Sequence, residues 1–345
     1  MSPNPTAVAD PGLEAKVAFL LEERGYPETT SGVTGIETHM SWVFLTDRYA
    51  YKLKKPVRFS YLDFSTEEAR RKDCLEELRL NRRLTRGVYI EVAALTLDQD
   101  GKLRISSDKG AVVDWLVKMR RLPAERMLDV MIRDHRVGID DIHSVADALS
   151  RFYLECAPVK VPPDEYRKRL AETIAEHLEE LSTPAFALPA ALVEQICASQ
   201  RGVLDRCSAL FGERATSGKI VEGHGDLRPE HICVEPQPQI IDCLEFSRDF
   251  RILDRADELA FLALECERLG APELKAPIFE TYGELTGDRP HPALVNFYQS
   301  HRACLRAKMS IWHLKDPALR ANPKWPAQAR DYLRLSHEHI EQCVC

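Results

Sequence analysis

The sequence predicts an α+β protein of two lobes, a small β-rich lobe followed by a large, mainly helical one. Short apolar runs with strand-like alternation are confined to about the first 120 residues, where one long helical segment stands among them. After Pro123 the chain is mostly helical, and one hairpin-like segment interrupts the helices. A chain of 345 residues is also too long for one small core. We therefore expect an N-terminal lobe at 1–122 and a C-terminal lobe at 123–345.

The first lobe is expected to alternate between strands and helices. In chain order, the expected elements are a helix at 11–26, strands at 41–47 and 49–55, a helix at 65–87, and strands at 89–106 and 110–123. The helix at 65–87 carries acidic residues in its first turn, with Ser65 or Thr66 as the N-cap and Gly87 past its end. In the second lobe, helices are expected at 140–156, 165–182, 190–211 and 254–270.

The hairpin-like segment HGDLRPEHICVEPQPQIIDCLEF, residues 224–246, carries an aspartate near each of two short apolar runs. Asp226 follows His-Gly and precedes the run HICV, and Asp242 ends the run QIID. A turn interrupted by proline joins the two runs. This arrangement can direct both carboxylates at one point.

Four segments in the right order resemble motifs of one family. HGDLRPEHI resembles the catalytic loop of the protein-kinase-like fold, and IIDCLEF resembles the metal-binding segment of aminoglycoside phosphotransferases. DRADELAFL resembles the helix that follows that segment, and ETHMSWVFLTDRYAYKLKKPV is similar to the phosphate loop and lysine strand. The chain thus resembles aminoglycoside phosphotransferase-like proteins, close to uncharacterised bacterial members, over roughly residues 30 to 265.

The resemblance implies roles for residues of the hairpin-like segment. Asp226 matches the catalytic base that accepts the proton of the acceptor hydroxyl, and Arg228 is placed to contact the γ-phosphate. Asp242 matches the ligand of Mg²⁺, and His224 would brace the loop. His231 replaces the usual asparagine ligand, so a single-metal enzyme, an enzyme that prefers Mn²⁺ and a protein without turnover all remain open.

In the first lobe the resemblance implies a lysine that meets the α- and β-phosphates of ATP. Lys52 shares a strand face with Ala50, in a pattern like V-A-I-K, and is our choice. Lys54 on the same face is the reserve, and Lys55 is expected at a solvated edge.

Other nucleotide contacts follow from the same resemblance. Helical spacing places Glu77 on the buried stripe of the helix at 65–87, so it is preferred over Glu76 as the partner of Lys52. Adenine is expected near Met119 to Leu122. Thr38 and Ser41 occupy the phosphate-loop position and are candidate phosphate contacts, although G-x-G-x-x-G is missing there.

We therefore expect an ATP-dependent small-molecule kinase that uses Mg²⁺ or Mn²⁺ and acts on a hydroxyl group. A protein kinase is the weaker alternative, because only eleven residues separate Asp242 from Asp254 and leave no room for a long activation loop. A nucleotide-binding pseudokinase with a regulatory role is the alternative from another class. No G-x-x-x-x-G-K-[ST] motif is present, which excludes a P-loop kinase.

Composition restricts the partners and the location. The net charge of −7, without a basic block, argues against a nucleic-acid partner. No apolar run approaches the roughly 18 residues that a membrane helix needs. The N-terminal residues lack the basic-then-apolar order of a signal peptide, so we expect a cytoplasmic protein. The sequence makes no prediction of the oligomeric state.

Overall fold

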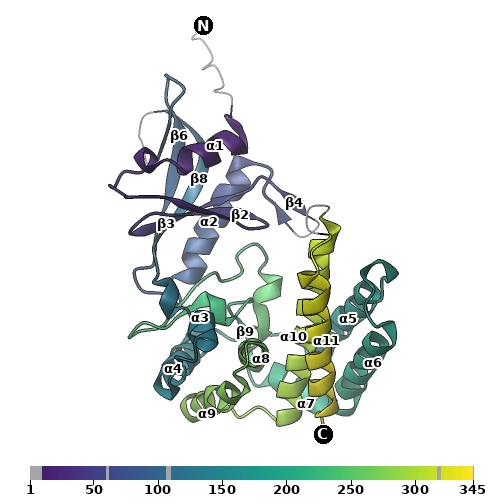
Figure 1. Ribbon diagram of the computed structural model, residues 1–345. Helices are drawn as coiled ribbons and strands as arrows, with labels where there is room; N and C mark the ends of the chain where they lie inside the picture. The colour runs from purple at the N-terminus through teal and green to yellow at the C-terminus, as the bar shows by residue number, and fades with distance from the viewer. Residues whose placement is uncertain (1–9, 60–61, 106–109, 317–319, 345) are drawn as a thin grey trace. The chain divides into compact units, whose positions relative to one another are not determined.

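The computed structural model describes residues 10–59, 62–105, 110–316 and 320–344 (Figure 1). The chain forms two compact units. Unit 1 consists of residues 1–127 and 231–248, and unit 2 consists of residues 128–230 and 249–345. One boundary after residue 122 was expected from the sequence, and the chain crosses between the units three times. Residues 231–248, which carry Asp242, therefore group with the first unit rather than with the helical part.

Unit 1 is built around a six-stranded antiparallel sheet with the strand order β1-β2-β3-β8-β6-β7. Its described helices and strands are α1 (Gly12–Leu20), β1 (Thr34–Glu37), β2 (Ser41–Leu45), β3 (Tyr49–Lys54), β4 (Arg58–Phe59), β5 (Leu62–Asp63), α2 (Glu67–Asn81), β6 (Tyr89–Leu97), β7 (Leu103–Ile105), β8 (Ala111–Arg120), β10 (Ile232–Cys233) and β11 (Gln239–Ile240). The two expected strands around the lysines and the long helix are present. The sequence analysis missed β1 and the short strands β4 and β5.

The central strand β3 places alternate side chains on opposite faces of the sheet. Tyr51 and Leu53 pack in one apolar cluster with Leu20 of α1, and Ala50 packs in another with Cys74 of α2. Period-two alternation therefore puts Lys52 on the α2 face, together with Ala50. This is the strand register that the sequence predicted.

Helix α2 begins at the predicted cap but ends earlier than expected. The Thr66 hydroxyl accepts a hydrogen bond from the N–H of Ala69 at 3.2 Å, which satisfies one free donor of the first turn. The helix ends at Asn81 rather than near Gly87. Beyond it, the N–H of Arg83 bonds the carbonyl of Leu80, a tighter i→i−3 turn that closes the helix.

Unit 2 is mainly helical. Its described helices and strands are α3 (Leu128–Arg133), α4 (Ile139–Glu155), α5 (Pro163–Leu181), α6 (Ala190–Arg206), α7 (Ser208–Thr216), β9 (Ile220–Glu222), β12 (Ile252–Asp254), α8 (Arg255–Arg268), α9 (Lys275–Thr286), α10 (Pro292–Trp312) and α11 (Lys324–Glu341). The helix expected at 190–211 is divided, because Cys207 leaves the helical region with ψ 24° and separates α6 from α7.

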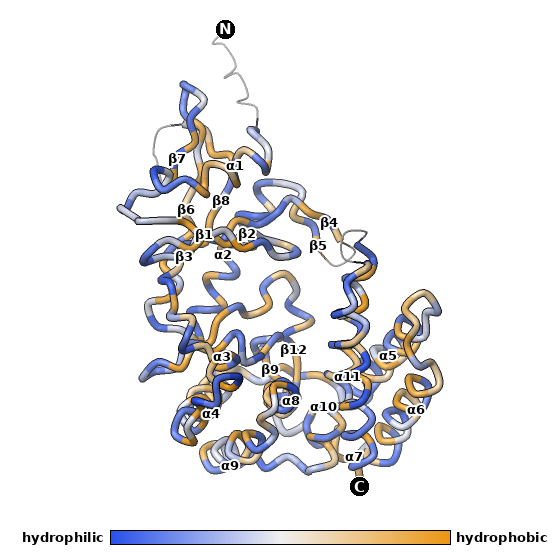
Figure 2. Tube along the Cα trace, in the orientation of Figure 1, coloured by the Kyte–Doolittle hydropathy of each residue, from blue (hydrophilic) through white to orange (hydrophobic). Residues whose placement is uncertain are grey.

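The core of unit 2 lies among α5, α6, α7, α8, α10 and α11. Helices α10 and α11 run side by side (Figure 1). Along α5 and α11, hydrophobic and hydrophilic residues alternate (Figure 2), which is typical of helices with one face on a core. Among the described residues, no helix combines the length and the apolar character needed to cross a bilayer.

Candidate active site

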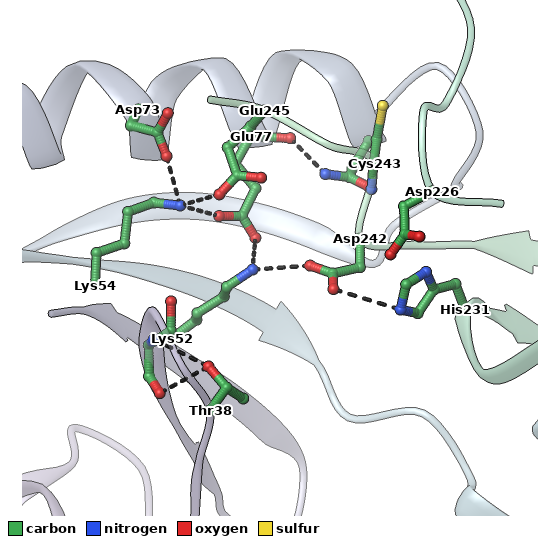
Figure 3. Close-up of polar contacts among 12 residues, drawn as sticks. Thr38, Lys52, Lys54, Asp73, Glu77, Asp226, His231, Asp242, Cys243 and Glu245 are labelled. Atoms are coloured by element: carbon green, nitrogen blue, oxygen red, sulfur yellow. Dashed lines mark hydrogen bonds and ion pairs between the residues drawn. The ribbon is translucent and has the colours of Figure 1, made fainter. Parts of the chain in front are cut away.

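Lys52 of β3 joins two parts of unit 1 that are distant in sequence. Its Nζ lies 2.9 Å from Oε1 of Glu77 on α2 and 2.8 Å from Oδ1 of Asp242 (Figure 3). Burial disfavours the charge of Lys52, but Asp242 and Glu77 outweigh that cost and hold its pKa well above 10.5. The expected pair of Lys52 with Glu77 rather than Glu76 is thus present, and its role in binding ATP stays a prediction.

Lys54, which the sequence analysis kept in reserve, is completely buried among three carboxylates. Its Nζ lies 2.7 Å from Asp73, 2.7 Å from Glu77 and 2.5 Å from Glu245 (Figure 3). Glu77 therefore receives one lysine on each carboxylate oxygen, Lys52 on Oε1 and Lys54 on Oε2. The sequence analysis missed Asp73 and Glu245. The spacing of Asp73 and Glu77 was a usable signal, since residues four apart lie on one side of a helix.

The cluster around the two lysines carries an excess of negative charge. Four carboxylates, those of Asp73, Glu77, Asp242 and Glu245, face Lys52 and Lys54. Burial raises the pKa of Asp73 to about 7 against the opposing effect of Lys54. Burial acts in the same direction on Glu245, but Lys54 and Lys52 overcome it and lower its pKa. Such an excess suits a site that receives a divalent cation.

The backbone around Asp242 is fixed by side chains from α2 and β6. Asp242 has a left-handed backbone with φ 60°, which aspartate tolerates better than most residues. Its N–H donates to the Tyr89 hydroxyl at 3.1 Å, and the N–H of Cys243 donates to the Asn81 side-chain oxygen at 2.9 Å. The Asn81 amide in turn donates to the carbonyl of Glu77 at 2.8 Å. Helix α2 thus positions both the lysine partner and the segment that carries Asp242.

His231 lies beside Asp242 in unit 1. Its Nε2 is 3.6 Å from Oδ2 of Asp242, and its side chain is nearly buried (Figure 3). The N–H of Ile241 donates to the carbonyl of His231 at 2.8 Å, which ties the two strands of the hairpin together. One carboxylate oxygen and one imidazole nitrogen therefore lie together, a donor pair that suits Mn²⁺ better than Mg²⁺.

Thr38 and Ser41 close the turn between β1 and β2. The Thr38 hydroxyl accepts from the N–H of Ser41 at 3.0 Å and donates to the carbonyl of Ser41 at 2.9 Å. The expectation of a solvated Lys55 is wrong, because its side chain is only 13% exposed. Lys55 Nζ donates to the Thr38 carbonyl at 2.7 Å and pairs with Glu37 at 2.5 Å. It therefore supports the turn in which phosphate contacts were predicted.

Met119 and Leu122, the expected adenine neighbours, lie near the end of β8. Met119 is buried and is paired in the sheet with Ala50 on one side and Tyr89 on the other. Leu122 packs against the same apolar cluster. The contact of Met119 and Leu122 with adenine stays a prediction.

In unit 2, a buried glutamate that the sequence analysis missed holds the loop around His224. Oε1 of Glu258 on α8 accepts the N–H of His224 at 2.8 Å and that of Gly225 at 2.6 Å, and Oε2 accepts the Tyr153 hydroxyl at 2.8 Å. Burial raises the pKa of Glu258 against these hydrogen bonds. Gly225 has φ 91°, a left-handed value that favours glycine and explains the glycine of His-Gly-Asp.

The Asp226 carboxylate follows directly from this loop and is partly exposed. The backbone N–H of Asp226 donates to Nδ1 of His224 at 3.2 Å, so the buried His224 braces the loop as expected. Arg228 pairs with Asp226 at 3.0 Å and with Glu230 at 2.6 Å. The two predicted catalytic residues are therefore neighbours, and the guanidinium is held between two carboxylates.

Asp254 is the N-cap of α8. Its carboxylate accepts the N–H of Ala256 at 2.8 Å and is completely buried. Arg214 donates to both of its oxygens at 2.7 Å, and the Tyr298 hydroxyl donates at 2.9 Å. Strand β12, which ends at Asp254, pairs with β9, and β9 ends just before the loop that carries His224 and Asp226.

Known proteins of similar sequence lie in mycobacteria. No family model matches the chain. Uncharacterised proteins of Mycobacterium tuberculosis and Mycobacterium bovis are 29% identical to it in an alignment of 318 positions that covers 89% of this chain and 60% of each relative. The chain thus spans about 60% of the length of these relatives.

Solved structures of similar fold are small-molecule kinases and phosphotransferases. A choline/ethanolamine kinase family protein of Mesorhizobium loti has a TM-score of 0.54 at 15% identity and covers 95% of this chain and 94% of its own. Choline kinase of Cryptosporidium parvum also scores 0.54, at 12% identity and coverages of 95% and 97%. An aminoglycoside phosphotransferase in complex with AMP-PNP and hygromycin B scores 0.52, at 14% identity and coverages of 95% and 99%. The chain has their protein-kinase-like fold, so the predicted fold class is confirmed.

Proposed function

We propose that the protein is an ATP-dependent phosphotransferase that moves the γ-phosphate of ATP to a hydroxyl group of a small molecule. The observation that carries this proposal is the ion-pair chain Glu77–Lys52–Asp242 on the α2 face of the sheet. A lysine of this kind pairs with a helix glutamate and can meet the α- and β-phosphates in the protein-kinase-like fold. The AMP-PNP in the structure of one protein of this fold supports ATP as the donor.

In the proposed reaction, the acceptor oxygen forms a bond to the γ-phosphorus while the bond from that phosphorus to the ADP oxygen breaks. Asp226 accepts the proton of the acceptor hydroxyl, and Arg228 stabilises negative charge on the transferred group. Thr38 and Ser41 contact phosphate, and Met119 and Leu122 contact adenine. Mg²⁺ or Mn²⁺, held by Asp242 and His231, would neutralise charge on the β- and γ-phosphates.

A small acceptor is favoured over a protein. Proteins of the same fold are named as kinases of choline and ethanolamine and as an aminoglycoside phosphotransferase. These acceptors differ from one another, so the fold supports the reaction and leaves the acceptor open. The absence of a nucleic-acid partner, the absence of membrane association and the cytoplasmic location stay predictions.

A regulatory pseudokinase is the second candidate. It is favoured by one observation, the imidazole of His231 at 3.6 Å from Asp242, where the usual motif has an amide oxygen. Against it stands the presence of Asp226 and Arg228 in addition to Asp242, because a protein without turnover has no need of a catalytic base or of a contact to the transferred phosphate.

The two candidates separate in one experiment. The purified protein is given γ-labelled ATP, Mg²⁺ or Mn²⁺ and a library of small hydroxyl compounds, and ATP binding, ADP formation and labelled product are measured. Lys52→Met is the inactive comparison, and Lys102→Ala, on an exposed turn, is the control. Labelled product from the wild type supports the phosphotransferase. ATP binding without product from any acceptor supports the pseudokinase, and failure to bind ATP contradicts both.

A further inference from the structure

Two arginines of unit 2 share one buried carboxylate. Nε of Arg268, at the end of α8, lies 3.0 Å from Oε2 of Glu265, and Nε of Arg306 on α10 lies 3.2 Å from Oε1 of the same residue. The Glu265 side chain is completely buried, whereas those of Arg268 and Arg306 are 23% and 13% exposed. One carboxylate cannot neutralise two guanidinium groups, so this cluster keeps a surplus positive charge at a solvent-accessible position.

A tyrosine fixes both arginines in place. The guanidinium carbon of Arg268 lies 5.4 Å from the ring centroid of Tyr332 on α11, and that of Arg306 lies 5.7 Å from it. The Tyr332 hydroxyl donates to Oε1 of Glu265 at 2.7 Å. Two cations stacked on one ring repel each other, and the Arg306 charge indeed opposes the positive form of Arg268. The two arginines are therefore held in a defined geometry, and the single negative charge of Glu265 does not balance their two positive charges.

The terminal nitrogens of these arginines are available. Within the described part of the chain, Arg268 bonds Glu265 through Nε alone. Arg306 uses its Nε for Glu265 and for the Tyr332 hydroxyl at 3.3 Å, and one of its terminal nitrogens makes a weak contact with the Met309 sulfur at 3.7 Å. Terminal guanidinium nitrogens that have no strong acceptor within the protein can form forked hydrogen bonds to carboxylate or phosphate oxygens of a ligand. The protein as a whole has a net charge of −7, so a local positive cluster does not simply follow from its composition.

Helix α8 places the cluster near the predicted catalytic base. Its Glu258 accepts the N–H groups of His224 and Gly225, next to Asp226, and Glu265 lies seven residues further on the same side of this helix. Burial opposes the charge of Arg306, but Glu265, Tyr332 and Asp226 outweigh burial and raise the pKa of Arg306. Asp226 belongs to the same unit. Arg302 lies one turn toward the N-terminus of α10. Its Nε and one terminal nitrogen donate to the two oxygens of Asp257 at 2.7 and 2.6 Å, so it has fewer donors left for a ligand.

We propose that Arg268 and Arg306, stacked on Tyr332, form an anion subsite for the phosphate acceptor, which carries a carboxylate or a phosphate group in addition to its reacting hydroxyl. This inference rests on the proposed function, because it assigns the second ligand of that reaction. Hydroxy acids and sugar phosphates share the required chemistry.

The test compares hydroxyl compounds of related skeleton that carry an anionic, a neutral or an amine group. Glycerate is compared with glycerol and 3-amino-1,2-propanediol, and glucose 6-phosphate with glucose and glucosamine, by calorimetry in the presence of saturating AMP-PNP and Mn²⁺. We expect at least one anionic compound to bind about tenfold more tightly than its neutral and amine counterparts. Equal binding throughout both sets, or preference for the amines, would overturn the proposal.

Variants assign any preference to the cluster. Arg268→Gln leaves Glu265 paired with Arg306 and Tyr332, so folding is preserved and the preference for anions should fall about fivefold or more. The reciprocal variant Arg306→Gln leaves Glu265 paired with Arg268 and Tyr332, and it removes the surplus positive charge in the same way. The control is Arg334→Gln, an exposed arginine of α11 that pairs with Glu338. A preference that survives in both cluster variants contradicts the assignment.

Phosphate transfer to the same compounds separates the two proposals. Anion preference without transfer of phosphate to any acceptor would count against the phosphotransferase and leave the anion site standing. Transfer to neutral or amine compounds only would support the phosphotransferase and reject the anion subsite.

Discussion

The ammonium group of Lys54 and the carboxylate of Glu245 lie 2.5 Å apart in the interior of unit 1. Glu245 follows Asp242 by three residues in the chain. Lys54 also holds Asp73 and Glu77, so one lysine links strand β3, helix α2 and the segment that carries Asp242. We expect Lys54→Met to destabilise the protein by about 3–5 kcal/mol, because Asp73 and Glu245 lose their cation and Glu77 keeps only Lys52. Where the variant is folded, we expect ATP to bind at least about tenfold more weakly, as measured by calorimetry.

The matched control for this prediction is Lys16→Met. Lys16 is also buried and lies 2.8 Å from Asp114, but it belongs to α1 and touches neither Glu77 nor Asp242. This variant should lose less stability, because Asp114 keeps its bidentate pair with Arg70 at 2.8 and 2.9 Å, and it should keep its affinity for ATP. Equal loss of ATP affinity in both variants would show that Lys54 acts through general stability alone.

Lys52 of β3 and Lys55, just past its end, should differ in their effect on ATP binding. Lys52→Ala is expected to weaken binding most, because only Lys52 pairs with both Glu77 and Asp242. Lys55→Ala should have a smaller effect, since Lys55 acts through the carbonyl of Thr38 in the β1–β2 turn. Titration of each variant with ATP at fixed metal concentration measures the order, with Lys102→Ala as the control. A larger loss for Lys55→Ala would mean that the turn, rather than the lysine pair, dominates the affinity.

Local patterns in the sequence were sufficient for the residues whose position follows from one element. Strand alternation placed Lys52 and Lys54 on the face of Ala50, and helical spacing placed Glu77 on the buried stripe of α2. The partners of Lys54 were not predictable in this way. Glu245 reaches Lys54 across 191 residues of sequence, and such a contact depends on how the segment after β11 packs on α2.

Glu258 shows the same limit. Its position on α8 follows from helical spacing, but its hydrogen bonds to the N–H groups of His224 and Gly225 depend on tertiary packing. The exposure of Lys55 was misjudged for a related reason, because a lysine at a strand end is often solvated unless a neighbouring turn offers it a carbonyl.

Asp226 should be required for turnover and not for binding of ATP. We expect Asp226→Asn to keep ATP affinity within about twofold and to lower the rate of phosphate transfer by on the order of 10²-fold or more, because an amide cannot accept the hydroxyl proton. Glu230→Gln is the control, since Glu230 pairs with Arg228 but has no predicted part in proton transfer. Full phosphate transfer by Asp226→Asn would reject Asp226 as the base.

Two buried histidines should make the protein sensitive to acid. Burial lowers the pKa of His301 to about 3 and that of His177 well below 6.5, and the two rings lie 5.1 Å apart. Both therefore stay neutral in the folded state at pH values where they are protonated in the unfolded chain. The unfolded state binds more protons below about pH 6.5, so the free energy of unfolding falls as the pH drops.

The variant His177→Phe removes one of these groups without loss of a hydrogen bond, because neither ring nitrogen of His177 has a partner among the described residues. We expect the variant to gain stability relative to the wild type at pH 5 and to gain less at pH 8. Urea denaturation at both pH values measures the difference, and His143→Phe, on an exposed position of α4, is the control. An equal gain at both pH values would contradict the predicted titration.

His231 should determine which metal ion supports activity. Its Nε2 lies 3.6 Å from Oδ2 of Asp242, so a metal ion bound to Asp242 is within reach of the imidazole. Mg²⁺ prefers oxygen ligands in octahedral geometry, and Mn²⁺ accepts nitrogen more readily. We expect Mn²⁺ to support at least as much activity as Mg²⁺ in the wild type. In His231→Asn, which restores an amide oxygen, the ratio of activities should shift toward Mg²⁺.

The measurement is the rate of ATP turnover against the concentration of each metal ion in both proteins, with direct titration of Mn²⁺ as a readout that does not depend on turnover. His231→Gln, with its amide on a longer side chain, tests whether the position of the oxygen matters. If His231 instead hydrogen-bonds the acceptor, the variant changes the KM for the acceptor and leaves the metal ratio unaltered. An unchanged ratio together with unchanged Mn²⁺ affinity would therefore remove His231 from the metal site and leave Asp242 as the protein ligand that the hairpin supplies.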